Sequence, residues 1–240
     1  MARFFVESVA GDSHVLTGAD AAHAAKSLRM RAGERLTLCD TAQMEYDCVI
    51  RSVEEGAVLL DVTDKHPSAA EPGVRITLYQ GLPKGDKMDL IVQKAVELGV
   101  FRVVPTLCAR CVSRPDAKSL RKKRERWQKI AEEAAKQSGR GRIPEVGEAL
   151  ELQEALAEAA GEDLLLLCYE GGGRKISALL PAGARSAAVF IGPEGGFEPV
   201  EAEAALRAGG CHATLGARIL RTETAPLAAL TALLCAAGEL

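Results

Sequence analysis

The chain has 240 residues, of which 48% are hydrophobic and 26% are charged, and these ordinary globular proportions exclude a disordered, collagenous or coiled-coil chain. One Trp, three Tyr and five Phe are too few for a protein that holds single-stranded nucleic acid mainly by stacked bases. The net charge of -3 is unevenly distributed, because residues 110–142 hold twelve Lys or Arg against four Asp or Glu, whereas residues 143–240 hold six against fourteen.

The first 66 residues or so predict a small β-rich domain. Short strand-like runs occur at 36–39, 46–50 and 58–62, and one helical segment occurs at 19–28. Residues 66–73 contain two prolines and a glycine and predict a linker.

After this linker, predicted strands alternate with predicted helices, which indicates an α/β domain with a mostly parallel sheet covered on both faces. Ligands of such sheets bind at the carboxyl ends of the strands. The predicted strands are 74–80, 100–107, 163–168, 187–191 and 211–215, and the predicted helices are 87–98, 119–137, 151–160, 200–208 and 225–237.

The sequence also predicts a cytoplasmic protein. The N-terminus reaches Glu7 before the roughly 7 to 15 apolar residues of a secretory signal. The longest uncharged stretch, residues 225–238, is shorter than the ~20 residues of a membrane-spanning helix. Seven scattered cysteines, an odd number, do not resemble a disulfide scaffold.

Residues 110–142, the basic segment, combine an apolar helical stripe with a cationic remainder. Such a segment is either a solvated helix face or a surface that contacts a phosphate backbone, in which case binding would depend steeply on salt. The sequence alone leaves both interpretations open.

Two further strings follow predicted strands. Residues 192–197 (GPEGGF) begin where strand 187–191 ends, and adjacent glycines let a backbone approach a ligand closely and adopt positive φ. An ordinary turn is the alternative. Residues 215–226 (LGARILRTETAP) lead into the last helix, where Thr224 is the predicted N-cap and Pro226 is tolerated in the first turn. Capping does not account for the charges at Arg218, Arg221 and Glu223.

A third string, residues 80–88 (QGLPKGDKM), precedes a helix on which Lys87 and Lys94 lie two turns apart on one face. Solubility alone is the alternative reason for these lysines. Dinucleotide and P-loop fingerprints are absent. Cys108 and Cys111 have zinc-ligand spacing, but no second pair follows, so we predict no metal site.

Together these strings resemble one family. The resemblance is carried by residues 29–33 (RMRAG), 84–89 (KGDKMD), 93–100 (QKAVELGV), 110–112 (RCV), 133–140 (EAAKQSGR), 191–197 (IGPEGGF) and 215–226. Over nearly its whole length the chain is similar to the bacterial 16S ribosomal RNA uridine N3-methyltransferases of the SPOUT superfamily.

This resemblance implies a PUA-like RNA-binding β-barrel over residues 1–70 and a trefoil-knotted α/β domain over residues 74–240, in a homodimer. It implies that S-adenosylmethionine binds among the knot loops. The implied cofactor-binding residues are Leu167, Cys168, Tyr169, Gly171, Ile191, Gly192, Pro193, Glu194, Gly195, Gly196, Leu215, Gly216, Ile219, Leu220 and Arg221.

Uracil N3 carries a proton at neutral pH, so its methylation needs a base or cations that stabilise the uracil anion. We expect Arg221 and Arg110 to stabilise charge and Glu223 or Glu170 to receive the proton. Salt bridges to Arg218 or Lys175 are the alternative roles of the two glutamates.

The implied partner is 16S ribosomal RNA or the small ribosomal subunit, with neither membrane nor metal. The expected phosphate contacts are Arg29, Arg31, Lys84, Lys87, Lys94, Arg121, Lys122, Lys123 and Arg140. Two alternatives remain at this point. One is ribose 2'-O-methylation, and the other is an inactive RNA binder that acts in ribosome assembly.

Overall fold

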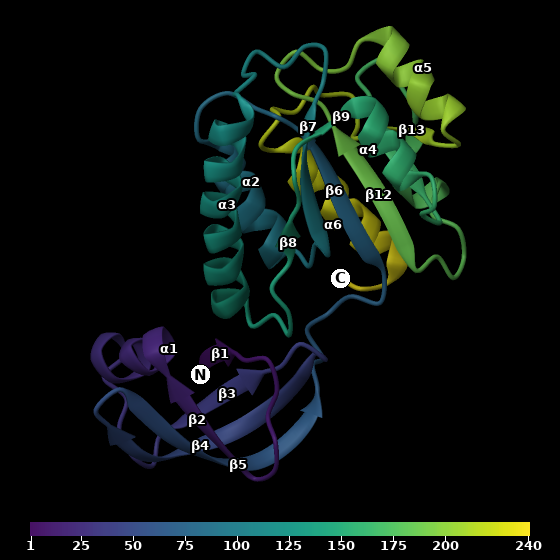
Figure 1. The fold of residues 1–240 in the computed structure, drawn as a ribbon. Helices are drawn as coiled ribbons and strands as arrows, with labels where there is room; N and C mark the ends of the chain where they lie inside the picture. The colour runs from purple at the N-terminus through teal and green to yellow at the C-terminus, as the bar shows by residue number, and fades with distance from the viewer. The chain divides into compact units, whose positions relative to one another are not determined.

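The computed structural model describes all residues from Met1 to Leu240. The chain divides into two compact units (Figure 1). The first unit comprises Met1–Glu71 and Ala135–Ile143, and the second comprises Pro72–Ala134 and Pro144–Leu240. No helix of the chain is both long enough and apolar enough to span a membrane.

The first unit is built on a curled five-stranded sheet with the strand order β1-β3-β4-β5-β2. Its strands are β1 (Ala2–Phe5), β2 (Ser13–Thr17), β3 (Arg35–Cys39), β4 (Met44–Glu54) and β5 (Ala57–Pro67). A helix, α1 (Gly18–Ala22), continues into a short π-helical turn at His23–Ser27. The predicted strands and helix of this region are therefore confirmed, whereas β1 and β2 were not predicted.

The linker begins later than the sequence suggested. β4 and β5 pair over eleven residues each, and the last pair joins Met44 to Pro67, so His66 and Pro67 belong to the sheet. β2 covers only residues 57–61 of β5. Proline is tolerated at Pro67 because this end of β5 has no strand on its other side to receive an N–H.

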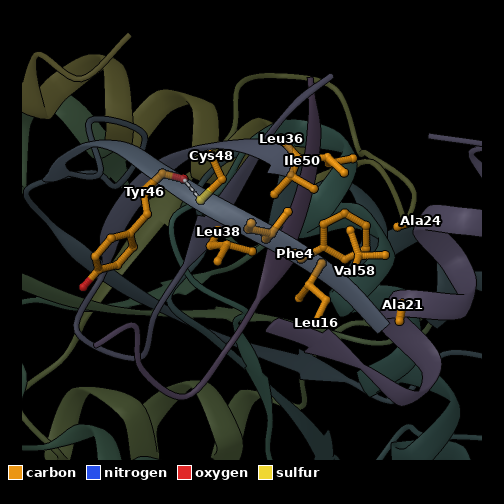
Figure 2. Close-up of a cluster of buried hydrophobic side chains, with 11 residues drawn as sticks. Phe4, Leu16, Ala21, Ala24, Leu36, Leu38, Tyr46, Cys48, Ile50 and Val58 are labelled. Atoms are coloured by element: carbon orange, nitrogen blue, oxygen red, sulfur yellow. Dashed lines mark hydrogen bonds between the residues drawn. The ribbon is translucent and has the colours of Figure 1, made fainter. Parts of the chain in front are cut away.

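The core of the first unit is formed by the inward side chains of the strands and by two alanines of the helical segment (Figure 2). Phe4, Leu36, Leu38 and Leu60 are completely buried. Burial of each side chain of this size contributes roughly 1.5–3 kcal/mol to folding.

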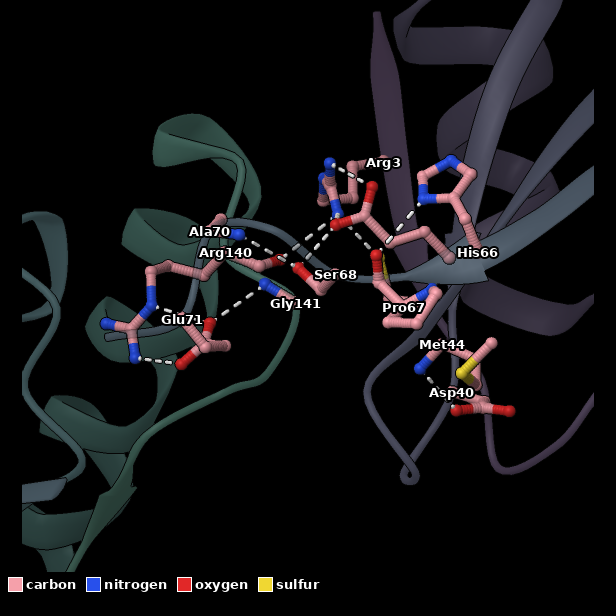
Figure 3. A network of polar contacts seen from close by, with 12 residues as sticks. Arg3, Asp40, Met44, His66, Pro67, Ser68, Ala70, Glu71, Arg140 and Gly141 are labelled. Atoms are coloured by element: carbon pink, nitrogen blue, oxygen red, sulfur yellow. Dashed lines mark hydrogen bonds and ion pairs between the residues drawn. The ribbon is translucent and has the colours of Figure 1, made fainter. Parts of the chain in front are cut away.

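A polar network joins residues 135–143 to this unit (Figure 3). The guanidinium of Arg140 forms an ion pair of 2.6 Å with Glu71, and the same carboxylate accepts a hydrogen bond from the backbone N–H of Gly141 at 2.9 Å. Arg3 pairs with Glu45 at 2.9 Å and also donates to the carbonyl of Arg140. Arg140 is only 2% exposed. This corrects the expectation that Arg140 contacts phosphate, because its charge is enclosed and already paired.

The second unit contains an eight-stranded parallel sheet with the order β11-β13-β10-β12-β6-β7-β8, and β9 pairs with β7. Its strands are β6 (Arg75–Gly81), β7 (Arg102–Leu107), β8 (Glu145–Val146), β9 (Leu150–Glu151), β10 (Leu165–Cys168), β11 (Arg174–Lys175), β12 (Ser186–Ile191) and β13 (Cys211–Thr214). Every residue of β12 is buried, as expected of a strand covered on both faces.

Helices cover both faces of this sheet (Figure 1). They are α2 (Lys87–Glu97), α3 (Ala117–Ser138), α4 (Leu152–Ala159), α5 (Pro199–Arg207) and α6 (Ala225–Ala237), and a 3-10 turn lies at Ile176–Ala178. α6 packs on α2, β6 and β12, whereas α4 and α5 pack on each other and on β7 and β10 respectively. The predicted helices and longer strands are confirmed; the two-residue strands β8, β9 and β11 were not predicted.

The segment that follows β13 returns from the edge of the sheet to its centre. β13 lies near one edge of the sheet, yet the following segment returns to α6, which packs on the central strands β6 and β12. The returning segment, residues 214–222, thus crosses the ends of β10 and β12. The predicted fold class, a mostly parallel α/β domain preceded by a small β-rich unit, is confirmed. Thr224 occupies the predicted N-cap position of α6, although its side chain makes no capping hydrogen bond.

Candidate active site

A cavity of about 590 Å³ lies at the carboxyl ends of β10, β12 and β13. Residues 168–170, 191–196 and 214–222 line it, together with Ala225. Each of these three segments begins at the end of one strand and contains residues that the family resemblance implied for the cofactor site. The parallel sheet therefore brings these distant segments to one edge.

Thirteen of the fifteen expected cofactor-binding residues lie on the cavity wall. The other two, Leu167 and Gly171, do not. Leu167 is completely buried inside β10, where it pairs with Phe190 and His212. Gly171 lies against the ring of Tyr169, so it borders a wall residue without reaching the cavity. The wall also contains Thr214, Ala217, Thr222 and Ala225, which were not among the residues expected to bind the cofactor.

Gly196 shows why glycine is required in this wall. Its φ is +68°, a conformation that L side chains rarely adopt, and an added Cβ would meet the carboxylate of Glu170. Gly192 lies close by, because a Cβ added there would be 3.1 Å from the Cα of Gly196. The loop thus presents backbone rather than side chains to the cavity.

Lys87 connects two of the strings. Its ammonium lies 2.9 Å from Glu194 Oε1 and 3.5 Å from Glu223 Oε2. Burial acts to raise the pKa of Glu194, but hydrogen bonds from Lys87 and from the backbone N–H of Lys84 hold that pKa below its ordinary value. The salt-bridge partner of Glu223 is therefore Lys87 and not Arg218, the partner considered from sequence.

The remaining candidate catalytic residues occupy different positions. Glu170 and Arg221 lie on the cavity wall and are exposed, and Glu170 forms no ion pair with Lys175. Arg110 does not line the cavity, but its Nη1 donates a hydrogen bond of 2.9 Å to the carbonyl of Gly195, a wall residue. Arg110 therefore touches the site through the backbone of the glycine loop.

The basic residues expected to contact phosphate divide into paired and free groups. Lys94 pairs with Glu97 at 2.8 Å, and Lys123 lies 6.0 Å from the ring centroid of Trp127. Arg121 and Lys122 are exposed on α3 and form no ion pair within the chain. The remaining exposed candidates are Arg29 and Arg31 in the first unit and Lys84 in the second.

Cys108 and Cys111 lie beside each other in the interior. The backbone N–H of Cys108 donates to Cys111 Sγ at 3.3 Å. A hydrogen bond from the Cys108 thiol lowers the pKa of Cys111, and the same pairing raises the pKa of Cys108. The two sulfurs have no His, Asp or Glu close enough to complete a metal site.

Comparison with known proteins identifies the family. Residues 70–234 match the model of the RNA methyltransferase domain, and residues 16–63 match that of the RNA methyltransferase PUA domain. Ribosomal RNA small subunit methyltransferase E of Bacillus subtilis (strain 168) is 37% identical over 97% of this chain and 96% of its own length. The chain belongs to the ribosomal RNA small subunit methyltransferase E family.

Further relatives and solved structures are similar to nearly the whole chain. The Mycobacterium tuberculosis protein is 33% identical over 95% of this chain and 89% of its own length. The Neisseria gonorrhoeae enzyme was solved bound to S-adenosylmethionine; it is 31% identical, covers 98% of this chain and 97% of that one, and superposes with a TM-score of 0.83. A Legionella pneumophila protein solved with the same cofactor gives a TM-score of 0.87 at 31% identity, over 98% of this chain and 97% of that one.

Proposed function

We propose that this chain uses S-adenosylmethionine to methylate N3 of a specific uridine in 16S ribosomal RNA, with the assembled small subunit as its substrate. The observation that carries the proposal is the cavity of about 590 Å³ walled by the three loops after β10, β12 and β13. Family membership supports the RNA methyltransferase activity. The cytoplasmic location and the homodimer expected from the sequence belong to the same proposal.

The residues of the cavity fit this cofactor. Its volume is within the roughly 300–1,000 Å³ of small-molecule sites, and the glycine loop offers backbone N–H and C=O groups that can pair with an adenine edge. The wall also carries a carboxylate at Glu194 and a guanidinium group at Arg218. These charges complement the amino and carboxylate groups of a methionine moiety. When bound, S-adenosylmethionine supplies the activated methyl group.

The chain must supply a proton acceptor and stabilisation of negative charge for the uracil ring. Glu170 suits the first task, because its carboxylate is exposed on the cavity wall and forms no ion pair. Glu223 suits it less well, because Lys87 lies 3.5 Å from its Oε2. Arg221 is placed to stabilise charge on the base or its phosphate, and Arg110 supports the loop through Gly195.

Exposed cations supply the RNA contact in this proposal. Arg121 and Lys122 lie free on α3 and Lys84 is exposed before α2, while the PUA-like unit contributes Arg29 and Arg31. Such contacts give affinity without reading sequence, because phosphate carries no base information.

The test uses isotopically labelled S-adenosylmethionine as the methyl donor. Two substrates are compared, free 16S ribosomal RNA and assembled small subunits that lack the modification. Nucleoside analysis of the digested RNA should give 3-methyluridine, with much faster incorporation into subunits than into free RNA. A 2'-O-methylated nucleoside would instead establish the ribose reaction. Cofactor binding without any transfer would indicate the RNA-binding role.

A further inference from the structure

Gln80 is a polar side chain in the interior of the second unit that the proposed chemistry does not use. It lies near the end of β6, where it pairs with Ile191 of β12, and it is 0% exposed. Its Nε2 donates hydrogen bonds of 3.1 Å to the carbonyl of Gly81 and 3.1 Å to Thr222 Oγ1. The two residues of the second bond are 142 positions apart in the sequence.

Thr222 continues this chain of bonds to the glycine loop. Its Oγ1 donates to the carbonyl of Gly192 at 2.9 Å while it accepts from Gln80. Thr222 is 5% exposed, and it lies on the cavity wall next to Arg221. A hydroxyl that donates once and accepts once has a fixed orientation. Gln80 and Thr222 thus connect the end of β6, the crossing segment 214–222 and the loop 191–196.

The backbone segments next to these hydrogen bonds are also closely packed. A Cβ added to Gly81 would lie 2.6 Å from the backbone N of Pro193, so β6 and the glycine loop approach each other without a side chain between them. Segment 214–222 lies beside this contact and forms another wall of the cavity. It leads directly into α6. Thr222 makes the side-chain hydrogen bonds that tie segment 214–222 to β6 and to the glycine loop.

The stability of the fold does not account for an amide side chain at position 80. Its Oε1 is buried and accepts no hydrogen bond. A buried polar atom without a partner destabilises the fold, and an apolar side chain of similar length would avoid this cost. An apolar side chain could not make the Nε2 hydrogen bonds, of which the one to Thr222 reaches a different segment of the chain.

We propose that Gln80 and Thr222 are positioning residues that hold two walls of the cofactor cavity, loop 191–196 and segment 214–222, in register and thereby set the affinity for S-adenosylmethionine. This inference rests on the proposed function, because it concerns the same cavity. Neither residue touches the reacting atoms. Their effect is to keep the backbone groups of both walls in place before the cofactor arrives, which reduces the ordering cost of binding.

The experiment measures S-adenosylmethionine binding by calorimetry for the full chain and for T222V, T222S and Q80M. T222V keeps the shape of the side chain but removes the hydroxyl, and T222S keeps the hydroxyl. T106V is the matched control, because Thr106 is a buried threonine at the end of β7 whose Oγ1 bonds only within its own strand. We expect the dissociation constant to rise about tenfold for T222V and Q80M and to stay near the wild-type value for T222S and T106V.

Two further readouts separate positioning from a structural role. In steady-state methylation, T222V and Q80M should raise KM for S-adenosylmethionine while KM for RNA and kcat at saturating cofactor stay near wild type. The thermal unfolding midpoint of Q80M should stay close to that of wild type, because the variant removes the buried unpaired oxygen together with the two hydrogen bonds of Nε2.

Each outcome of these measurements supports or overturns the positioning role of Gln80 and Thr222. Wild-type affinity in both T222V and Q80M overturns the inference and leaves the proposed function intact. Absence of binding by the wild-type chain overturns the proposed function first. If T222V fails to fold, Q80M still reports the same bond, and if both variants lose the folded state the bonds serve stability and the inference is wrong.

Discussion

Glu194 Oε1 lies 2.9 Å from Lys87 Nζ, and this contact joins the loop after β12 to the first turn of α2. The same oxygen accepts a hydrogen bond from the backbone N–H of Lys84 at 3.1 Å. One carboxylate on the cavity wall therefore fixes the chain at the start of α2. Since Lys87 also faces Glu223, its charge is directed toward the cavity loops.

This geometry predicts different roles for two neighbouring lysines. K87M should weaken S-adenosylmethionine binding by a few-fold, because Glu194 loses its cation and the loop is less well held. K84M removes only an exposed side chain, since Lys84 contacts Glu194 through its backbone, so it should leave cofactor affinity unchanged and weaken RNA binding. Calorimetry with cofactor and filter binding with RNA measure the two effects. The interpretation fails if K87M lowers RNA affinity alone.

The position of Glu170 on the cavity wall predicts that it acts as the proton acceptor. E170Q should lower the single-turnover rate of methylation by about 10² to 10⁴, the usual contribution of a general base, with little change in cofactor affinity. E223Q is the matched control, and its rate should fall less than about tenfold, because Lys87 already occupies that carboxylate. An E170Q variant with the wild-type rate would exclude Glu170 from this role.

The free cations of α3 predict a salt-dependent RNA contact. The double reversal R121E/K122E should flatten the plot of log affinity for RNA against log salt by about 1.4 to 1.8, since two phosphate contacts are lost. K175E reverses an exposed charge on β11 outside the basic segment and should change this slope little. Both variants should bind S-adenosylmethionine normally. Loss of cofactor binding in R121E/K122E would show that these residues support the fold.

The cavity could be predicted from the sequence because each of its walls is a short segment that directly follows one strand in the chain. Gly192 and Gly196 directly follow an apolar strand, and loops that follow parallel strands must meet at one edge of the sheet. The partners of charged side chains could not be predicted in this way. Arg140 was expected on the surface, but its partner Glu71 is 69 positions away and becomes its neighbour only through the fold.

The same limit applies to short strands and to interior polar groups. β11, at Arg174–Lys175, has no alternation of its own and exists because it pairs with β13. Gln80 is the second-last residue of an apolar strand, and the sequence around it gives no sign of the hydrogen bond to Thr222. Hydrophobic periodicity reports which face of an element is buried, whereas long-range polar pairs depend on the arrangement of whole elements.

The last prediction concerns the pH dependence of stability in the first unit (Figure 3). Glu45 accepts hydrogen bonds from Arg3 at 3.0 Å and from Ser68 Oγ at 2.5 Å. Burial acts to raise the pKa of Glu45, but these bonds hold it below the ordinary value of 4.5. A depressed pKa in the folded state means that the stabilisation is complete above about pH 4.5 and is lost as the pH falls through the lower folded-state value.

E45Q should therefore destabilise this unit by about 1–3 kcal/mol at pH 7, and the difference from wild type should shrink below about pH 4. Hydrogen–deuterium exchange of peptides from β3 and β4, compared between variant and wild type at each pH, measures this local stability. E54Q, at the exposed end of the same strand, is the control and should differ little from wild type at any pH. The difference in local stability between E45Q and wild type could instead stay constant from pH 7 to about pH 3.5. This result would contradict the role assigned to the charge of Glu45, because that charge would then contribute nothing to the difference.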